Sequence, residues 1–102
     1  MANTFKNYTA SSVGTSANTV YTVPSATTAV VIGCNLANRT GSQVTVDVQL
    51  GSTYLVKGAP VPSGSSLGVL DGKVIMEATE TLSVTSSDAS SVDVILSVLE
   101  QS

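Results

Sequence analysis

The stretch that decides the fold is Gln43-Val44-Thr45-Val46-Asp47-Val48-Gln49-Leu50. Apolar and polar residues alternate through all eight positions, so the four apolar side chains share one face of an extended chain. This period of two is typical of a strand with one buried face, and the branched side chains of Val and Thr fit such a strand. The sequence therefore predicts a β-strand over residues 43–50 with its apolar face toward the core.

The same alternation recurs on both sides of this stretch, and no comparable helical period is found. The predicted strands cover residues 18–23, 29–36, 43–50, 54–56, 67–70, 73–77, 81–85 and 91–99. Seven or eight short strands at this spacing predict an all-β fold, an antiparallel β-sandwich or jelly roll. The side chains expected to face inward, besides those of residues 43–50, are Val30, Ile32, Cys34, Leu36, Leu82, Val84, Val92, Val94, Leu96 and Val98.

Asp71-Gly72 is the strongest local turn signal. This dipeptide is favoured in two-residue hairpin turns because Gly readily adopts a positive φ. A hairpin here pairs residues 67–70 with residues 73–77, so that Leu70 and Ile75 share a face. We interpret Asp71 and Gly72 as structural turn residues.

The first 17 residues do not follow the strand pattern. Residues 9–19 are small and polar, and they offer little apolar surface to offset the entropy of ordering. Phe5 and Tyr8 lie just before them, as half of the four aromatic residues in the chain. The sequence thus predicts a flexible N-terminal arm over residues 1–17 and a β-sandwich domain over residues 18–102. Either the arm is a frayed end, or Phe5 and Tyr8 anchor it to a partner.

The composition excludes several classes of function. The chain has no His, one Cys, and a formal net charge of −3 with only 11% charged residues. Without His the usual proton carrier and metal ligand are missing, and Glu77 with Glu80 makes a poor glycosidase pair in a domain with no Trp. We therefore predict no enzyme activity, no catalytic residues, no metal and no cofactor. The acidic balance argues against nucleic acid, and no apolar run is long enough to span a membrane.

A second apolar set points away from the predicted core. If the inward faces above are right, five residues lie on outer strand faces and form a candidate subunit contact. The alternative is that loops or the N-terminal arm cover them. A small all-β domain gains stability from self-association, so we expect a trimer or a dimer. The five residues are Val31, Leu70, Ile75, Ile95 and Leu99.

Parts of the chain resemble small β-rich virion proteins of tailed bacteriophages. The stretches that carry the resemblance are residues 21–24, 28–31, 69–78, 82–86 and 92–100. The resemblance implies a structural role without catalytic residues. We expect a capsid decoration (cement) protein that binds the major capsid protein or another virion protein. It would be made in the host cytoplasm and located on the capsid surface of the virion. The alternatives are a neck, tail or fibre-base component and, in another class, a carbohydrate- or receptor-binding module.

Overall fold

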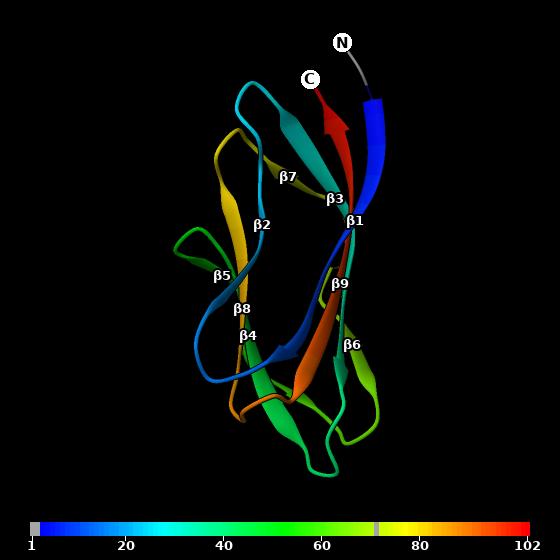
Figure 1. Ribbon diagram of the computed structural model, residues 1–102, viewed down its shortest axis with the longest axis vertical. Helices are drawn as coiled ribbons and strands as arrows, with labels where there is room; N and C mark the ends of the chain where they lie inside the picture. The colour runs from blue at the N-terminus through cyan, green and yellow to red at the C-terminus, as the bar shows by residue number, and fades with distance from the viewer. Residues whose placement is uncertain (1–2, 71) are drawn as a thin grey trace.

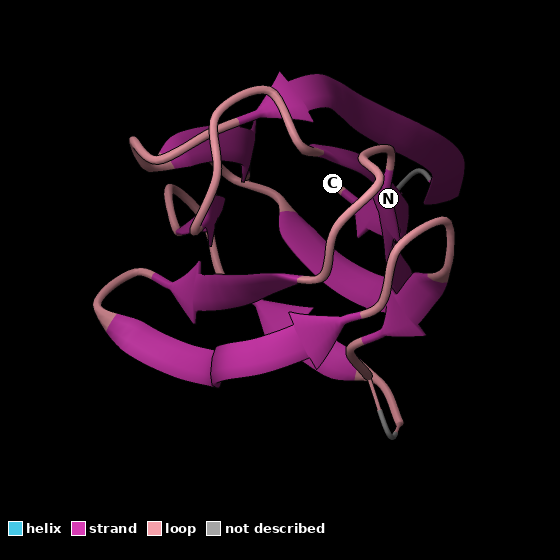
Figure 2. Cartoon of the chain, turned by 90° about the horizontal axis from the view of Figure 1, so that it is seen from below, coloured by secondary structure: helices cyan, strands magenta, loops and turns pink. Residues whose placement is uncertain are grey.

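The computed structural model describes residues 3–70 and 72–102, and within these ranges the chain forms nine strands and no helix. Two antiparallel sheets pack face to face in an elongated molecule of 45 × 21 × 21 Å (Figure 1). Figure 2 shows strands and loops only. The predicted antiparallel β-sandwich is confirmed. None of the described segments is a helix that could span a membrane.

The first sheet, called sheet A, has the order β1-β9-β3-β6, with β7 also paired to β3. The second, sheet B, has the order β2-β8-β4-β5. The strands of sheet A are β1 (Asn3–Val13), β3 (Thr28–Asn38), β6 (Ser66–Gly68), β7 (Val74–Met76) and β9 (Val92–Gln101). The strands of sheet B are β2 (Asn18–Thr22), β4 (Val44–Leu50), β5 (Thr53–Val61) and β8 (Thr81–Ser86).

The core lies between the two sheets and consists of branched aliphatic side chains. In β4, the side chains of Val44, Val46 and Val48 are buried, as the alternation predicts, while Leu50 at the strand end is half-buried. The predicted inward faces of β8 and β9 are also confirmed, with Leu82, Val84, Val92, Val94, Leu96 and Val98 buried. In strands without an internal bulge, the side chains thus alternate between core and solvent as their sequence predicts.

In strand β3, the side chains that face the core change from the predicted set halfway along the strand. Its register with β9 shifts between Val31 and Gly33, where a β-bulge adds one residue to β3. Before the bulge Val31 is fully buried, whereas Ile32 within it is 44% exposed. After the bulge Cys34 and Leu36 face the core as predicted. The placement of Val31 on the outer face, and of Val30 and Ile32 in the core, was therefore wrong.

The predicted hairpin around Asp71-Gly72 is also wrong. β6 and β7 do not pair with each other; they pair in succession with the same edge of β3, and Val69 N donates to the carbonyl oxygen of Cys34. They form one edge strand interrupted at residues 69–73. Gly72 has the expected positive φ, 138°, while Asp71 lies outside the described residues. Pairing with a long central strand outweighs the local turn preference.

Residues 3–13, predicted as part of a flexible arm, form strand β1 at the edge of sheet A. The strand pairs with β9 in continuous register from Asn3 to Ala10. Tyr8 and Ala10 are half-buried against the core, and Val13 is fully buried. Because so few of its side chains are apolar and buried, the sequence pattern does not indicate this strand. The strand is held instead by its backbone hydrogen bonds to β9 and by polar side-chain contacts.

Candidate functional site

The outer face of sheet A carries a row of apolar side chains that crosses four strands. Phe5 of β1 lies opposite Leu99 of β9, which lies opposite Val30 of β3, which in turn lies opposite Ile75 of β7. The sequence neighbours of Val30 and Leu99 are buried, and Ile75 lies between the partly buried Val74 and the buried Met76, so these three side chains point away from the core. Phe5, directly opposite Leu99, lies on the same face. Directly opposed side chains on one face of a sheet are close enough to form a continuous surface.

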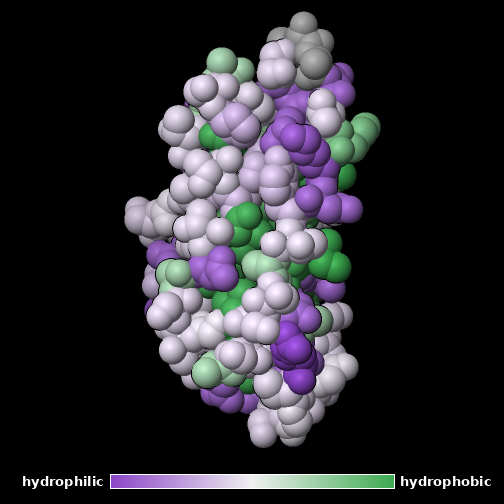
Figure 3. All heavy atoms as spheres, viewed as in Figure 1, coloured by the Kyte–Doolittle hydropathy of each residue, from purple (hydrophilic) through white to green (hydrophobic). Residues whose placement is uncertain are grey.

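This row belongs to a larger exposed apolar patch. Phe5 is 74% exposed, Ile75 63%, Ile95 50% and Ile32 44%. These are four of the five large hydrophobic side chains found exposed in the described part of the chain; the fifth is Tyr54 in sheet B. In Figure 3, apolar atoms reach the surface along the right-hand outline, on the side of β1, β3 and β9. Contiguous apolar surface of this kind marks interaction sites in soluble proteins.

A groove of about 520 Å³ opens on the same face beside the row. Small residues of the strands, Gly33, Gly68 and Ser97, leave this space open. Ile32 and Ile95 flank it, and residues of the 69–73 interruption border it. The bulge in β3 and the interruption between β6 and β7 therefore create a hollow on an otherwise flat sheet.

The central part of this face carries no charge among the described residues that point outward from it. Asp93 lies toward one end, where its Oδ1 accepts hydrogen bonds from the backbone N–H of Ser12 (2.9 Å) and from Arg39 Nη1 (3.3 Å). Lys73 borders the groove. A partner surface can therefore cover the patch without burying an unpaired carboxylate.

The structure brings together most, but not all, of the residues predicted for a subunit contact. Ile75, Ile95 and Leu99 lie on the outer face of sheet A, and Leu70 borders the groove from the interruption while packing partly against the core. Val31 is buried. Sequence reasoning missed Ile32, because the bulge reverses its direction. It assigned Phe5 to the arm instead of to this face.

The four sheet edges differ in how well they are protected. β5 carries Lys57, a positive φ at Gly58 (64°) and Pro60, and its register with β4 is irregular. β2 has five residues and a register shift, and the β6–β7 edge is interrupted. β1 has eight residues in unbroken register with β9, contains no Pro, and is unpaired with any described strand on its other side. An exposed, regular edge of this length favours pairing with another chain.

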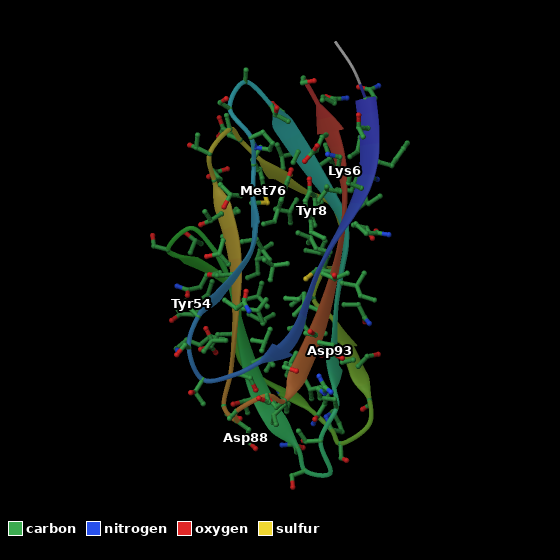
Figure 4. The ribbon with its side chains drawn as sticks, in the orientation of Figure 1. Lys6, Tyr8, Tyr54, Met76, Asp88 and Asp93 are labelled. Carbon is green, nitrogen blue, oxygen red and sulfur yellow. The ribbon has the colours of Figure 1, made fainter. Side chains whose placement is uncertain are left out.

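A polar cluster fixes β1 at the end of the sandwich that holds both termini (Figure 4). The hydroxyls of Tyr8 and Tyr21 donate to the same Glu100 oxygen, Oε2, at 2.7 and 2.6 Å, and their rings stack with centroids 4.3 Å apart. Lys6 Nζ lies 3.6 Å from Glu100 Oε1. The cluster links β1 and β9 of sheet A to β2 of sheet B.

Hydrogen bonding and burial shift the pKa values in this cluster. The hydrogen bonds from Tyr21 and Tyr8 lower the pKa of Glu100, since they favour its ionised form. Burial, followed by the hydrogen bond to Glu100, raises the pKa of Tyr8 to about 12 and that of Tyr21 further. We interpret the cluster as a structural clasp, because every polar group in it is occupied by another.

The remaining reactive groups do not form a chemical site. Cys34 is buried, and burial raises its pKa to about 11, so the reactive thiolate is disfavoured. Among residues 3–70 and 72–102, no three His, Cys, Asp or Glu side chains are grouped in a way that could hold a metal ion. The prominent features of the described surface are thus an apolar face and an open strand edge.

Comparison with known proteins gives one finding, a similarity in fold. No protein-family model matches the chain, and no curated protein matches it. Among solved structures, the fold is similar to a chain of the Bacillus endospore appendages, described as a novel family of disulfide-linked pili. The TM-score is 0.56 and the sequence identity 16%, and the match covers 98% of this chain and 88% of that chain. At this identity the likeness shows the fold alone.

This likeness corrects the predicted relationship to phage proteins. The matched structure is a pilus protein, so the interpretation as a capsid decoration protein on the virion surface, with the major capsid protein as partner, was wrong. The finding is nearer to the alternative of a fibre-base structural component. What this chain resembles, over nearly its whole length, is the subunit fold of an appendage pilus.

Proposed function

We propose that this protein is a structural subunit that associates with copies of itself into a filament of an extracellular appendage. The similarity in fold to a pilus protein supports this proposal. So does a surface that offers an apolar face and an open sheet edge. Polymerisation of one chain requires a contact that does not close on itself, such as a head-to-tail contact between different edges of neighbouring copies.

The observation that carries the proposal is the outer edge of β1. Its regular run from Asn3 to Ala10 exposes backbone N–H and C=O groups to solvent. A strand edge of a second copy can satisfy these groups through main-chain hydrogen bonds, which extends sheet A from one subunit to the next. The Glu100 clasp holds β1 in place beforehand, so pairing orders little additional chain.

The contacts in such a filament would not be covalent. The chain has one Cys, and that thiol lies in the core of the sandwich. A disulfide to each of two neighbours needs at least two accessible thiols per subunit. We therefore expect an assembly that dissociates in detergent without a reductant, in contrast to the disulfide-linked pili that share the fold.

Proline substitution in β1 tests the edge contact. Neighbouring residues of an antiparallel strand point their N–H groups alternately toward and away from the partner strand. Of Lys6→Pro and Asn7→Pro, one therefore removes a hydrogen bond to β9 and the other only an outward N–H. The variant that loses only an outward N–H should have a melting temperature closer to that of the wild type. We expect this variant to form no filaments in electron micrographs.

Gly41→Pro, in the loop after β3, is the control substitution and should leave filaments unaffected. If both β1 variants polymerise like the wild type, or if the wild-type chain forms no filaments under any condition that keeps it folded, the proposed function is wrong.

A further inference from the structure

Strand β1 is attached to the rest of the sandwich by polar contacts near both of its ends (Figure 4). The Glu100 clasp holds its first half. At its other end, the backbone N–H of Ser12 donates to Asp93 Oδ1 (2.9 Å), and Arg39 Nη1 donates to Ser12 Oγ (2.6 Å). Within residues 3–10 no side chain is fully buried. Separation of these residues from β9 therefore withdraws no fully buried side chain from the core.

The backbone is strained at Ser12, where the regular ladder between β1 and β9 is interrupted. The register shifts between Ala10 and Val13, and Ser12 has a φ of 58°. This conformation is unfavourable for an L-residue, because its Cβ lies too close to the following carbonyl oxygen. Val13 is fully buried, and its carbonyl oxygen accepts a hydrogen bond from the backbone N–H of Ser91 (3.0 Å). Ser12 is thus a strained hinge between two ordered segments, and extension of the chain there relieves the strain.

We propose that residues 3–10 form an exchangeable strand, which leaves its own β9 and pairs with β9 of a second copy of the chain. A second copy fits the vacated edge because its β1 forms the same ladder and donates to Glu100 from the same tyrosine. Lys6, the one charged residue of the segment, again meets a carboxylate. Reciprocal exchange between two copies therefore changes contacts only at the hinge.

This exchange uses neither the outer edge of β1 nor the apolar face of sheet A. In an exchanged pair, β1 still lies at the edge of a sheet and its outer N–H and C=O groups remain open. Closed and exchanged subunits can both enter the edge contact proposed for the filament. The inference therefore goes beyond the proposed function and does not depend on it.

A disulfide across the β1–β9 ladder detects the exchange. Ala10 and Val94 are directly opposite, and both side chains pack in the core. Opposite Cα atoms of antiparallel strands are about 4.5–5.5 Å apart, a separation that a disulfide spans. Because both side chains point inward, a surface contact between two closed copies cannot join them.

The experiment mixes isotope-labelled Ala10→Cys chains with unlabelled Val94→Cys chains in oxidised glutathione. Both carry Cys34→Ala, which removes the native thiol. Mass spectrometry then measures the disulfides that link a labelled to an unlabelled chain. In the matched control, Val48→Cys replaces Val94→Cys, since Val48 is equally buried but lies on β4 of sheet B. We expect at least about tenfold more mixed disulfide than in the control, because exchange holds the two thiols together.

A substitution at the hinge sharpens the test. Proline has a φ near −65° and cannot adopt the positive φ of Ser12, so Ser12→Pro favours the extended hinge. It should raise the rate of mixed disulfide formation by about tenfold, as the cost of an unfavourable backbone conformation implies. Gly41→Pro, in the loop after β3, is the control and should leave the rate unchanged.

Mixed disulfide at the level of the Val48→Cys control would overturn the proposal, and this comparison does not require the Ser12→Pro variant to fold. If Ser12→Pro exposes the thiol of Ala10→Cys without forming mixed disulfide, β1 frays and does not exchange, which also overturns it. Filaments without mixed disulfide would leave the proposed function standing and remove this inference. Mixed disulfide without filaments would do the reverse.

Discussion

The two outer faces of the sandwich are built from the same alternating strands but present opposite surfaces to solvent. On sheet A, Phe5, Ile75 and Ile95 are exposed without a polar cover. On sheet B the one exposed aromatic, Tyr54, lies under Lys57, whose Nζ is 4.6 Å from the ring centroid and 3.7 Å from Asp47 Oδ2. The outer face of sheet A therefore exposes apolar side chains directly to solvent, whereas the exposed aromatic ring of sheet B is covered by a charged side chain.

The largest expected effect comes from adjacent substitutions in β3 that test which side chains belong to the sheet A surface. Val31→Asp places a carboxylate in the core and should lower the free energy of unfolding by about 3 kcal/mol or more. Ile32→Asp, one residue later, should change it by no more than about 0.5 kcal/mol, since the bulge turns that side chain to solvent. Urea denaturation of both variants measures the difference. Equal losses would show that the bulge is misplaced.

An intermediate effect is expected at the clasp that joins the two sheets. Glu100→Gln removes the charge that accepts two tyrosine hydroxyls and should cost about 1–3 kcal/mol. The lowered pKa of Glu100 means that its contribution is present above the unfolded-state value, about 4.3, and is lost as pH falls through the folded-state value.

The two tyrosines shift in the opposite direction. Their raised pKa values mean that stability is lost as pH rises from the unfolded-state value, about 10, through the folded-state values. Thermal melts across pH should show the wild type losing stability at both extremes. Glu100→Gln should lose less than the wild type on acidification. If Glu100→Gln loses as much stability at low pH as the wild type, then other carboxylates dominate the acid sensitivity of the protein.

The smallest effect is expected on sheet B. Tyr54→Ser should change the free energy of unfolding by no more than about 0.5 kcal/mol, because the ring is exposed and its partners are solvated. Urea denaturation of the variant measures the change. A larger loss would show that the ring is not solvated, and that the two faces do not differ in the way described above.

How far the sequence predicts this molecule depends on whether each strand is regular. The parity of β4, β8 and β9 could be predicted, because alternation persists over their buried positions. In β3, the extra residue at Ile32–Gly33 reverses which side chains face the core before and after the bulge. No residue type in the sequence indicates that a bulge occurs there. Half of the exposed patch was therefore predictable, and Ile32 was not.

The pairing of β6 and β7 and the existence of β1 could not be predicted for different reasons. Asp71-Gly72 favours a hairpin locally, but the choice between a hairpin and two successive pairings with β3 depends on contacts far apart in sequence. β1 is held by its ladder with β9 and by Glu100, whose position 92 residues from Tyr8 leaves no local signal. Phe5 was consequently assigned to a flexible arm, whereas the structure places it in strand β1.

The single buried thiol has a practical consequence for measuring motion in this protein. Cys34 lies on a central strand of sheet A, between β9 and the β6 edge, with its side chain in the core. A thiol reagent can reach it only when this region opens, so the labelling rate under native conditions reports the free energy of that opening. No second cysteine contributes to the signal. The labelling rate of Cys34 can therefore be followed without introducing a probe. A lower rate in assembled than in dispersed subunits would measure how much assembly stabilises this region against opening.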